Sequence, residues 1–337
     1  MDFAELNPEA LAHNVLKEYG IAPDKLTLVQ SGTIKTVWKL NEKGRQLCLK
    51  RLKQTYDKAL FSVNAQIYIR NSGGKVPGII LNRENKPITE YNGQLFVVYE
   101  WISGNDLNFG IPADLRQALQ GLAGFHIASK GYTSAEEARI STKLGKWPDQ
   151  YASMKRKLTE WKSVSSQNNK PCYTAYLSAV DPMLDIAEQA LQRLAGSDYL
   201  HLTQPESPCI VLCHQDFGRG NVLAATDGIY VLDLDGVTYD LSARDLRKII
   251  GKNAENAGQW SIETIRTILG WYTEINPIGR DELEVLYADL SFPHWFFGLV
   301  KNMFQKGKAL KPAEIERIAA LEQSKDETLK TLLKRSE

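Results

Sequence analysis

The feature that most constrains the fold is a change in hydrophobic pattern near residue 105. Before it, short runs rich in β-branched and aromatic residues alternate with turn residues, which is typical of strands. Only two early segments, about 10–19 and 57–71, have the three- and four-residue apolar spacing of helices. Beyond residue 105 the pattern is mainly helical. It predicts a small β-rich lobe followed by a larger helical lobe, with a ligand cleft where they join.

The expected elements follow from the same patterns. The predicted strands of the first part are 26–30, 37–41, 46–52, 78–81, 88–91 and 94–100. The predicted helices of the second part are 112–129, 147–163, 171–195, 261–274, 280–288 and 312–334, and one strand-rich island interrupts them at 210–234. A length of 337 residues suits two domains, each able to bury its own core.

Charge and composition exclude several kinds of partner. The chain has 41 Lys and Arg against 40 Asp and Glu, a net charge of +1, so nothing global attracts it to nucleic acid or to an acidic membrane. The densest basic run, 155–157, lies on a predicted helix and is typical of a solvated face. The first twenty residues have no apolar run of the kind a signal peptide needs. We therefore expect synthesis in the cytosol and no membrane partner.

The cysteines do not suggest a framework or a metal site. Cys48, Cys172, Cys209 and Cys213 are too few in a chain this long for a set of structural disulfides. Cys209 and Cys213 lie four residues apart, but no second pair or histidine cluster completes a zinc site. We expect reduced thiols.

The strand-rich island carries the residues with chemistry. Two apolar strands, 222–225 and 229–232, flank a Thr-Asp-Gly turn, which is typical of a hairpin. A hairpin brings its two ends together, so Asp216, Asn221 and Asp233 are expected to converge. Carboxylate and amide oxygens suit Mg²⁺ with phosphate, and a further carboxylate could accept a proton from an attacking hydroxyl. The arrangement predicts phosphoryl transfer.

The motifs of the island resemble a known superfamily. The segment 214–221 (HQDFGRGN), followed by 232–235 (LDLD), is similar to the catalytic and metal segments of aminoglycoside phosphotransferase/choline kinase-like enzymes. With its flanking residues, from Cys213 to Lys248, it resembles the CotS-type spore-coat family of endospore-forming bacteria, in its spore-coat protein I-like branch. The resemblance implies an α+β, protein-kinase-like bilobal fold, with a β-rich N-lobe over residues 1–100 and a mainly helical C-lobe over 101–337.

The resemblance also implies a role for each residue of the motif. Asp216 would be the catalytic base, and Asn221 and Asp233 would hold Mg²⁺. His214 would brace the catalytic loop. Asp245, twelve positions after Asp233, would bind backbone N–H groups of that loop, although a plain helix N-cap is an alternative compatible with this role.

The first lobe would supply the nucleotide-binding residues. Strand alternation puts Leu47 and Leu49 on one face of their strand and Lys50 on the other. Lys50 then matches the lysine that binds the α- and β-phosphates of ATP in kinase-like folds, although a lone strand lysine is more often solvated. The turn that contains Ser31 and Gly32 would cover the nucleotide, although by itself it is an ordinary hairpin.

The strand that ends the first lobe would become the hinge. Backbone groups of Glu100, Trp101 and Ile102 would meet the adenine, if this is not simply a buried strand. Kinase-like folds also pair their lysine with a glutamate from the following helix. The expected place is near Asn64, where this chain has no carboxylate; Asn64 or Gln66 could hydrogen-bond Lys50 but could not neutralise it.

The acceptor side is less defined. Phe217, Arg219, Tyr239 and the aromatic cluster 294–297 are candidate substrate contacts, although aromatic residues are more often core. Asp235 is either a second metal ligand or a solvated group. No acidic wall suited to a polycationic aminoglycoside is visible.

Two functions are compatible with these features. One is an ATP- and Mg²⁺-dependent phosphotransferase that acts on a hydroxyl of a small molecule or saccharide and is associated with the spore coat. The other is a catalytically impaired, kinase-like structural component of the coat, with other coat proteins as partners. Both share one fold, and fold does not decide between them.

Overall fold

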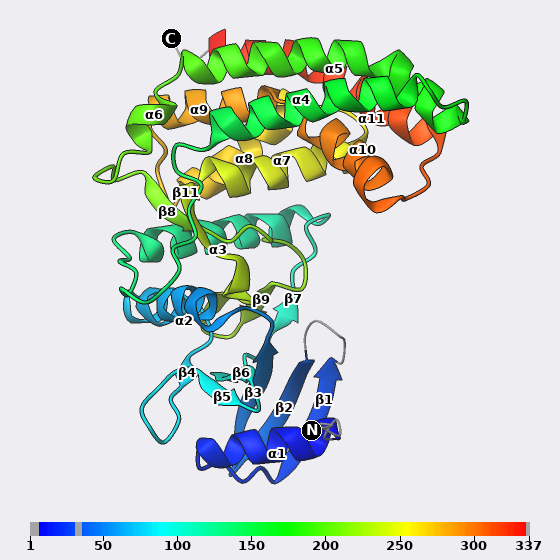
Figure 1. Ribbon diagram of the computed structural model, residues 1–337. Helices are drawn as coiled ribbons and strands as arrows, with labels where there is room; N and C mark the ends of the chain where they lie inside the picture. The colour runs from blue at the N-terminus through cyan, green and yellow to red at the C-terminus, as the bar shows by residue number, and fades with distance from the viewer. Residues whose placement is uncertain (1–6, 31–35, 335–337) are drawn as a thin grey trace. The chain divides into compact units, whose positions relative to one another are not determined.

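The computed structural model describes residues 7–30 and 36–334. The chain divides into two compact units (Figure 1). The sheet unit contains the residues up to Ser141 together with His214–Thr238, and the helical unit contains Thr142–Cys213 together with the residues from Tyr239 onward. The boundary near residue 101 concerns functional lobes rather than compact units, and it stays a prediction.

One antiparallel sheet forms the first part of the sheet unit. The strands follow one another across it in the order β1 (Lys25–Gln30), β2 (Thr36–Glu42), β3 (Arg45–Leu52), β6 (Gln94–Glu100) and β4 (Ile79–Ile80), and β5 (Thr89–Tyr91) also pairs with β6. The strands predicted from residue alternation are present. Those expected at 78–81 and 88–91 are shorter than predicted.

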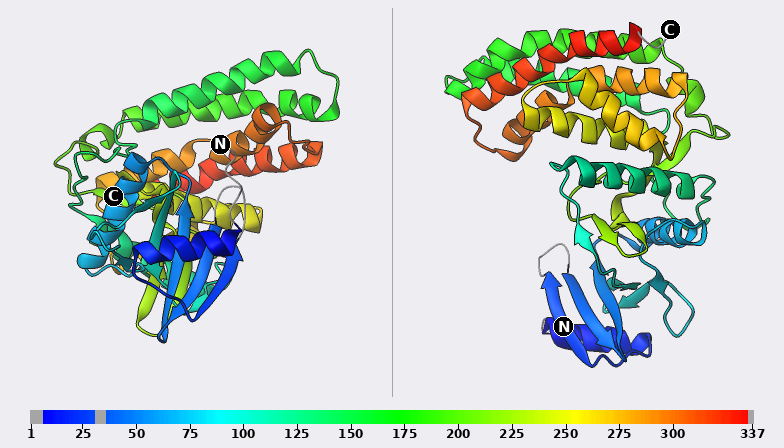
Figure 2. Two further views of the ribbon diagram at one scale, coloured as in Figure 1. Left: turned by 60° about the horizontal axis from the view of Figure 1, so that its bottom comes forward. Right: turned by 180° about the vertical axis from the view of Figure 1, so that it is seen from behind.

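A helix covers each face of this sheet (Figures 1 and 2). Helix α1 (Pro8–Glu18) presents Val15 and Leu16 to one face, where they form a buried cluster with Trp38 and Leu49. Helix α2 (Tyr56–Asn71) packs its apolar side chains against the opposite face; that cluster contains Leu52, Ala59, Val63, Leu95, Val97 and Tyr99. The alternation predicted for β3 is observed, because Leu47 and Leu49 join the first cluster and Cys48 packs against the second.

The rest of the sheet unit is a helix with a three-stranded sheet. Helix α3 (Pro112–Ser129) packs against the hairpin of β9 (Val222–Ala225) and β10 (Gly228–Val231), and β9 also pairs with β7 (Asn105–Asp106). A Cβ atom on Gly121 of α3 would lie 2.5 Å from Cγ2 of Ile229, so only glycine permits this close approach. A 3-10 turn, η1 (Leu234–Gly236), follows the hairpin.

The helical unit is built mainly from helices that pack side by side. Helix α5 packs against α4, α9 and α11. The elements are α4 (Trp147–Ser165), α5 (Pro171–Ala195), α6 (Tyr199–Leu202), α7 (Ala243–Ala257), α8 (Ile262–Thr273), α9 (Arg280–Ser291), α10 (His294–Lys306) and α11 (Pro312–Lys334), with β8 (Ile210–Cys213) paired to β11 (Thr238–Leu241). The expected helices are present. Helices α7 and α10 are additional to the predicted ranges, although the buried residues of α10, Phe296, Phe297, Val300 and Met303, have helical spacing.

Two expectations concern the chain as a whole. Each of the four cysteines is a thiol rather than half of a disulfide, as predicted. No helix within the described residues combines the length and the apolar character needed to cross a bilayer.

Candidate functional site

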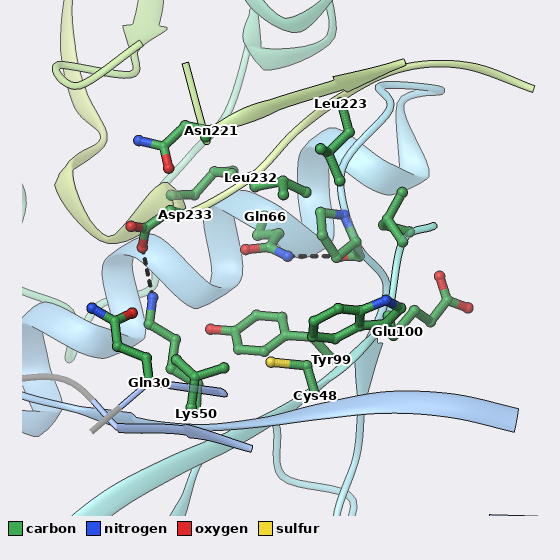
Figure 3. A pocket seen from close by; sticks show the side chains of 16 residues that line it. Gln30, Cys48, Lys50, Gln66, Tyr99, Glu100, Asn221, Leu223, Leu232 and Asp233 are labelled. Carbon is green, nitrogen blue, oxygen red and sulfur yellow. Dashed lines mark hydrogen bonds and ion pairs between the residues drawn. The ribbon is translucent and has the colours of Figure 1, made fainter. Parts of the chain in front are cut away.

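A pocket of about 280 Å³ lies within the sheet unit (Figure 3). Its walls come from the β-sheet, from α2 and from the hairpin of β9 and β10. The lining residues include Gln30, Val37, Cys48, Lys50, Gln66, Pro77, Tyr99, Glu100, Trp101, Ile102, Gly220, Asn221, Leu223, Leu232, Asp233 and Leu234. The pocket therefore brings together the predicted phosphate-binding lysine, the hinge residues and both predicted metal ligands.

Lys50 is the buried cation of this pocket. Its side chain is 8% exposed, and its amine lies 2.7 Å from Oδ1 of Asp233 and 2.6 Å from Oδ1 of Asp235. Burial alone would lower the pKa of the Lys50 amine, but the charges of Asp235 and Asp233 outweigh it and raise the pKa above its usual value. Lys50 is therefore a charged ammonium group that faces the pocket and can bind an anion.

The hairpin positions Asn221 and Asp233 next to each other. Val222 pairs with Val231, and one further bond, from the Leu232 N–H to the Asn221 carbonyl at 2.9 Å, closes the ladder. Asp233 then has φ 62° and ψ 59°, in the left-handed region that few residues other than glycine adopt. Such strained backbone is concentrated at functional sites, and here it sets the direction of the Asp233 carboxylate.

Asn221 presents an oxygen to the same point. Its side-chain nitrogen donates to the Asp216 carbonyl at 2.9 Å, which leaves the amide oxygen as an available ligand atom. Figure 3 shows this oxygen on the side of the Asp233 carboxylate. An amide oxygen beside a carboxylate is a donor set that suits Mg²⁺, which also takes phosphate oxygens and water. The residues present therefore fit a magnesium ion bound together with a nucleotide.

His214 connects the loop that carries Asp216 to the end of the hairpin. Its imidazole is fully buried, with Nε2 2.7 Å from the Leu232 carbonyl and Nδ1 3.3 Å from the Asp216 N–H. Since a carbonyl can only accept, Nε2 carries the proton and Nδ1 accepts from the Asp216 N–H. Asp216 itself is exposed, and its Oδ2 lies 3.5 Å from Nδ2 of Asn221.

Several polar groups of the hinge residues are already bonded within the protein. The Glu100 carboxylate accepts from the Gly78 N–H at 3.0 Å and from Nη2 of Arg70 at 3.1 Å. The Trp101 N–H donates to the Gln46 carbonyl at 3.0 Å. The Glu100 N–H also donates within the protein, to the Gly78 carbonyl at 2.8 Å. A base in the pocket would therefore have to be recognised by the remaining backbone groups of the hinge, its carbonyls and the Ile102 N–H.

Helix α2 contributes an amide where a carboxylate was expected. Gln66, rather than Asn64, lines the pocket, and its nitrogen donates to the Pro77 carbonyl at 2.7 Å. The only carboxylate of α2 is Asp57, in its first turn. Asp235 supplies the second negative charge beside Lys50 instead, and its backbone carbonyl accepts from Nε2 of Gln54 at 2.5 Å. Its side chain is 35% exposed, and both alternatives for Asp235, a second metal ligand or a solvated group, stay predictions.

Some lining residues were not predicted. Cys48 and Tyr99 line the pocket together with Lys50. The alternation along β3 places Cys48 on the same face as Lys50, so this pattern could have indicated Cys48; no sequence signal indicated Tyr99. Gln66 was considered as a partner of Lys50, but no pattern showed that its amide would bond to Pro77 instead.

Four predicted residues on loops have different outcomes. Ser31 and Gly32 lie outside the described residues. Phe217 is buried, with its ring 5.9 Å from that of Phe109, so it contributes to packing. Arg219 is exposed. Substrate contact by Phe217 and Arg219 stays a prediction.

Two predicted residues belong to the helical unit. Tyr239 is half-buried on β11. Asp245 is fully buried in the first turn of α7, three residues after the N-cap position of Ser242, so it does not cap the helix. Burial, together with the charge of Asp245, raises the pKa of the Cys213 thiol well above its usual value. The supporting role of Asp245 stays a prediction.

Comparison with known proteins agrees with the sequence motifs. Spore coat protein S of Bacillus subtilis (strain 168) is 23% identical over 338 residues, which cover 96% of this chain and 94% of that protein. An aminoglycoside phosphotransferase from Alicyclobacillus acidocaldarius subsp. acidocaldarius DSM 446 superposes with a TM-score of 0.76 at 19% identity, over 98% of this chain and 97% of the other. Amicoumacin kinase in complex with AMP-PNP, Ca²⁺ and Ami superposes with a TM-score of 0.60 at 16% identity, over 95% and 94% of the two chains.

These findings confirm the fold and the family. The superpositions show an α+β, kinase-like fold with a sheet in the N-terminal part and helices in the C-terminal part. The family model described as "Spore coat putative kinase YutH" matches residues 12–334. Since the match covers almost the whole chain, the chain belongs to this spore coat putative kinase family.

Proposed function

We propose that this protein is an ATP- and Mg²⁺-dependent phosphotransferase that transfers a phosphoryl group to a hydroxyl of a small molecule or saccharide. One observation carries the proposal: a single pocket holds Lys50, Asn221 and Asp233 with the geometry of a cation beside a metal-binding pair. The structural neighbours support it, because one aminoglycoside phosphotransferase and one amicoumacin kinase share the fold, the latter solved with AMP-PNP and Ca²⁺.

Each residue of the site has a defined task in this proposal. Lys50 binds nucleotide phosphate oxygens, and Asn221 and Asp233 hold Mg²⁺, which neutralises phosphate charge when bound. Asp216 accepts the proton of the acceptor hydroxyl as its oxygen forms a bond to the terminal phosphorus. The bond from that phosphorus to the bridging oxygen breaks, and ADP leaves. His214 keeps the Asp216 loop against the hairpin through its bonds to Leu232 and Asp216.

The remaining predicted residues complete the proposal. Backbone groups of Glu100, Trp101 and Ile102 would bind the adenine at the boundary between an N-lobe of residues 1–100 and a C-lobe of 101–337. Arg219 and Tyr239 would contact the acceptor. The family, and the coat protein named among the relatives, support a location in the spore coat and contacts with other coat proteins.

Thermal stabilisation tests the nucleotide site directly. Millimolar ATP with Mg²⁺ should raise the melting temperature of the wild type by mass action. The shift should be absent in Asp233→Ala and retained in Asp227→Ala, whose carboxylate lies at the turn of the same hairpin and outside the pocket lining. Equal shifts in the two variants, or none in the wild type, would refute the proposal.

A second candidate has its own supporting observation. Gln66 is the residue of α2 that lines the pocket, and its side-chain nitrogen donates to the Pro77 carbonyl. Helix α2 therefore provides no carboxylate to neutralise Lys50. This favours a kinase-like coat component that binds nucleotide without efficient transfer. Phosphate release from ATP that disappears in Asp216→Asn would support the enzyme. Stabilisation by ATP with no turnover in the wild type would support the structural role.

A further inference from the structure

A second pocket lies within the helical unit, where α4, α7, α10 and α11 contribute to its walls. Its volume is about 680 Å³. The lining residues include Gln150, Met154, Arg247, Lys248, Glu255, His294, Trp295, Phe297, Gly298, Leu299, Lys301, Asn302, Glu314, Arg317 and Ile318. None of them lines the pocket of the sheet unit, although three of them belong to the aromatic cluster 294–297 that the sequence indicated as candidate substrate contacts.

The most buried charged group in the lining of this pocket is Arg247. The side chain is only 9% exposed, and one terminal nitrogen, Nη1, lies 3.0 Å from Oδ1 of Asp289 and 2.8 Å from Nε2 of His294. Its other terminal nitrogen, Nη2, has no hydrogen-bond partner among the described residues. A guanidinium group that is fixed along one edge and unbonded along the other can bind an oxyanion.

Three buried groups hold this guanidinium in place. Asp289 is fully buried and accepts from the Tyr151 hydroxyl as well as from Arg247. His294 lies 2.8 Å from the same Asp289 oxygen. Because helices α4, α7, α9 and α10 each supply one member of the cluster, the direction of the Arg247 side chain is set before any ligand binds, which lowers the entropic cost of binding.

The rest of the pocket is cationic on balance. Four cationic side chains, Arg247, Lys248, Lys301 and Arg317, line it against two carboxylates, Glu255 and Glu314. Both carboxylates are engaged: Glu255 pairs with Lys252 at 2.9 Å, and Glu314 accepts from the Lys311 N–H at 2.9 Å. An anion in the pocket would therefore meet an excess of positive charge, with a buried guanidinium group in the lining.

One wall offers an apolar surface. The half-buried Trp295 ring packs on α7, where a Cβ on Gly251 would lie 1.8 Å from a ring carbon, so only glycine allows the indole to lie there. Trp260 packs edge-on against it, with the ring centroids 6.1 Å apart. A fixed indole beside polar groups suits a small organic molecule better than a bare ion.

We propose that the helical unit has a binding site for a small organic molecule that carries an oxyanion, either a phosphate or a carboxylate. The Arg247 guanidinium receives the oxyanion, Lys301 and Arg317 attract it, and Trp295 contacts the body of the molecule. The site is formed by the helical unit alone, so it does not depend on the proposed phosphotransferase activity.

The test measures binding of three matched probes to the full chain. Glucose 6-phosphate, glucuronate and glucose are titrated at constant ionic strength, with saturation-transfer NMR as the readout. One or both charged sugars should bind at millimolar concentration, and glucose should not. Binding of only one charged probe would identify the phosphate or the carboxylate as the recognised group.

The variants locate the binding. Removal of two exposed cations in Lys301→Ala/Arg317→Ala should weaken binding about fivefold. Arg247→Lys, which keeps the charge but loses the planar fork, should weaken it about tenfold. The control Lys306→Ala/Lys308→Ala removes two exposed lysines outside the pocket lining and should have no effect. Lys50→Met should also leave binding unchanged, which separates this proposal from the nucleotide site.

Four results would overturn the proposal. They are binding of glucose equal to that of the charged sugars, no binding of either charged sugar up to about 20 mM, an equal loss in the control double variant, and loss of binding in Lys50→Met. The exposed double variant keeps the test decisive if Arg247→Lys does not fold.

Discussion

Lys50 in the sheet unit and Arg247 in the helical unit are both buried cations paired with carboxylates, but their carboxylates differ in exposure. Lys50 and Arg247 are almost equally buried, with side chains 8% and 9% exposed. The partners of Lys50, Asp233 and Asp235, are 27% and 35% exposed, whereas Asp289, the partner of Arg247, is fully buried. Water or a ligand can therefore reach the carboxylates of Asp233 and Asp235 and separate them from Lys50. Neither can reach the buried carboxylate of Asp289.

The difference indicates which pair can exchange partners. Asp233 lies on a strained loop beside Asn221, so it can release Lys50 when another cation offers better coordination. Oδ1 of Asp289 accepts hydrogen bonds from Tyr151, Arg247 and His294. Its other oxygen, Oδ2, has no hydrogen-bond partner among the described residues. Burial of this ion pair costs solvation energy, but it fixes the geometry of the two side chains.

The largest expected effect is on stability. Asp289→Ala leaves Arg247 buried without its carboxylate and should lower the free energy of unfolding by about 3–5 kcal/mol. Asp233→Ala should lower it by about 1 kcal/mol or less, because solvent can replace the lost partner. Urea unfolding of both variants measures the difference. The surface variant Asp181→Ala, which removes an exposed partner of Lys162, serves as the control. Equal losses in the two variants would contradict the comparison.

The next effect is on catalysis. Asp216→Asn should reduce phosphoryl transfer about a hundredfold or more, because the amide cannot accept the hydroxyl proton. ATP affinity should change little, since Asp216 does not line the nucleotide pocket. Phosphate release and nucleotide binding are measured on the same preparation. A parallel loss of both would mean that the residue supports the fold rather than the chemistry.

The pH dependence of stability tests the helical-unit pair. Burial, followed by the charge of Arg247, lowers the pKa of His294 to about 3, below the 6.5 of an unperturbed imidazole. The unfolded chain therefore takes up a proton below pH 6.5 while the folded chain does not, so stability is lost as the pH falls from 6.5 toward 3. This group alone should make the protein about 2 kcal/mol less stable at pH 5 than at pH 7.

The matched variant isolates this contribution. His294→Gln has no imidazole to protonate, so the stability difference between wild type and variant should change between pH 7 and pH 5, whereas the contributions of other groups cancel. Chemical unfolding at the two pH values provides the measurement. A difference that stays constant would show that His294 can be protonated in the folded protein.

The smallest effect separates the possible roles of Asp235. If it replaces the helix glutamate as the partner of Lys50, Asp235→Asn should lower turnover about tenfold, and the double variant with Gln66→Glu should recover part of the loss. Steady-state phosphate release at varied Mg²⁺ provides the test. An increased Mg²⁺ requirement would identify a second metal ligand instead, and unchanged turnover would identify a solvated group.

The sequence predicted those features of the site that depend on residues close together along the chain. The turn between β9 and β10 predicted the convergence of Asn221 with Asp233, and strand alternation predicted the face of Lys50. The partners of Lys50 lie 183 and 185 positions away along the chain, so their distances depend on packing that no local pattern describes. For this reason the sequence points to helix α2, near Asn64, for a partner of Lys50, whereas the observed partners are Asp233 and Asp235.

The helical unit was less predictable for a related reason. Its buried cluster combines Tyr151, Arg247, Asp289 and His294, which lie on four different helices. In the sequence no local pattern links these four residues, because they lie on separate helices. Only the packing of the helices shows that they meet and that Arg247 faces a pocket.

The nucleotide site is tested most directly by calorimetric titration of ATP into the full chain, with Mg²⁺ and with a chelator in its place. Binding should require Lys50, weaken about tenfold or more in Asp233→Asn, and stay unchanged in Asp227→Asn. The chelator should weaken binding to the wild type but have little further effect on Asp233→Asn. Absence of binding, or equal affinity in Asp233→Asn and the wild type with Mg²⁺ present, would contradict the claim that this pocket binds a magnesium nucleotide.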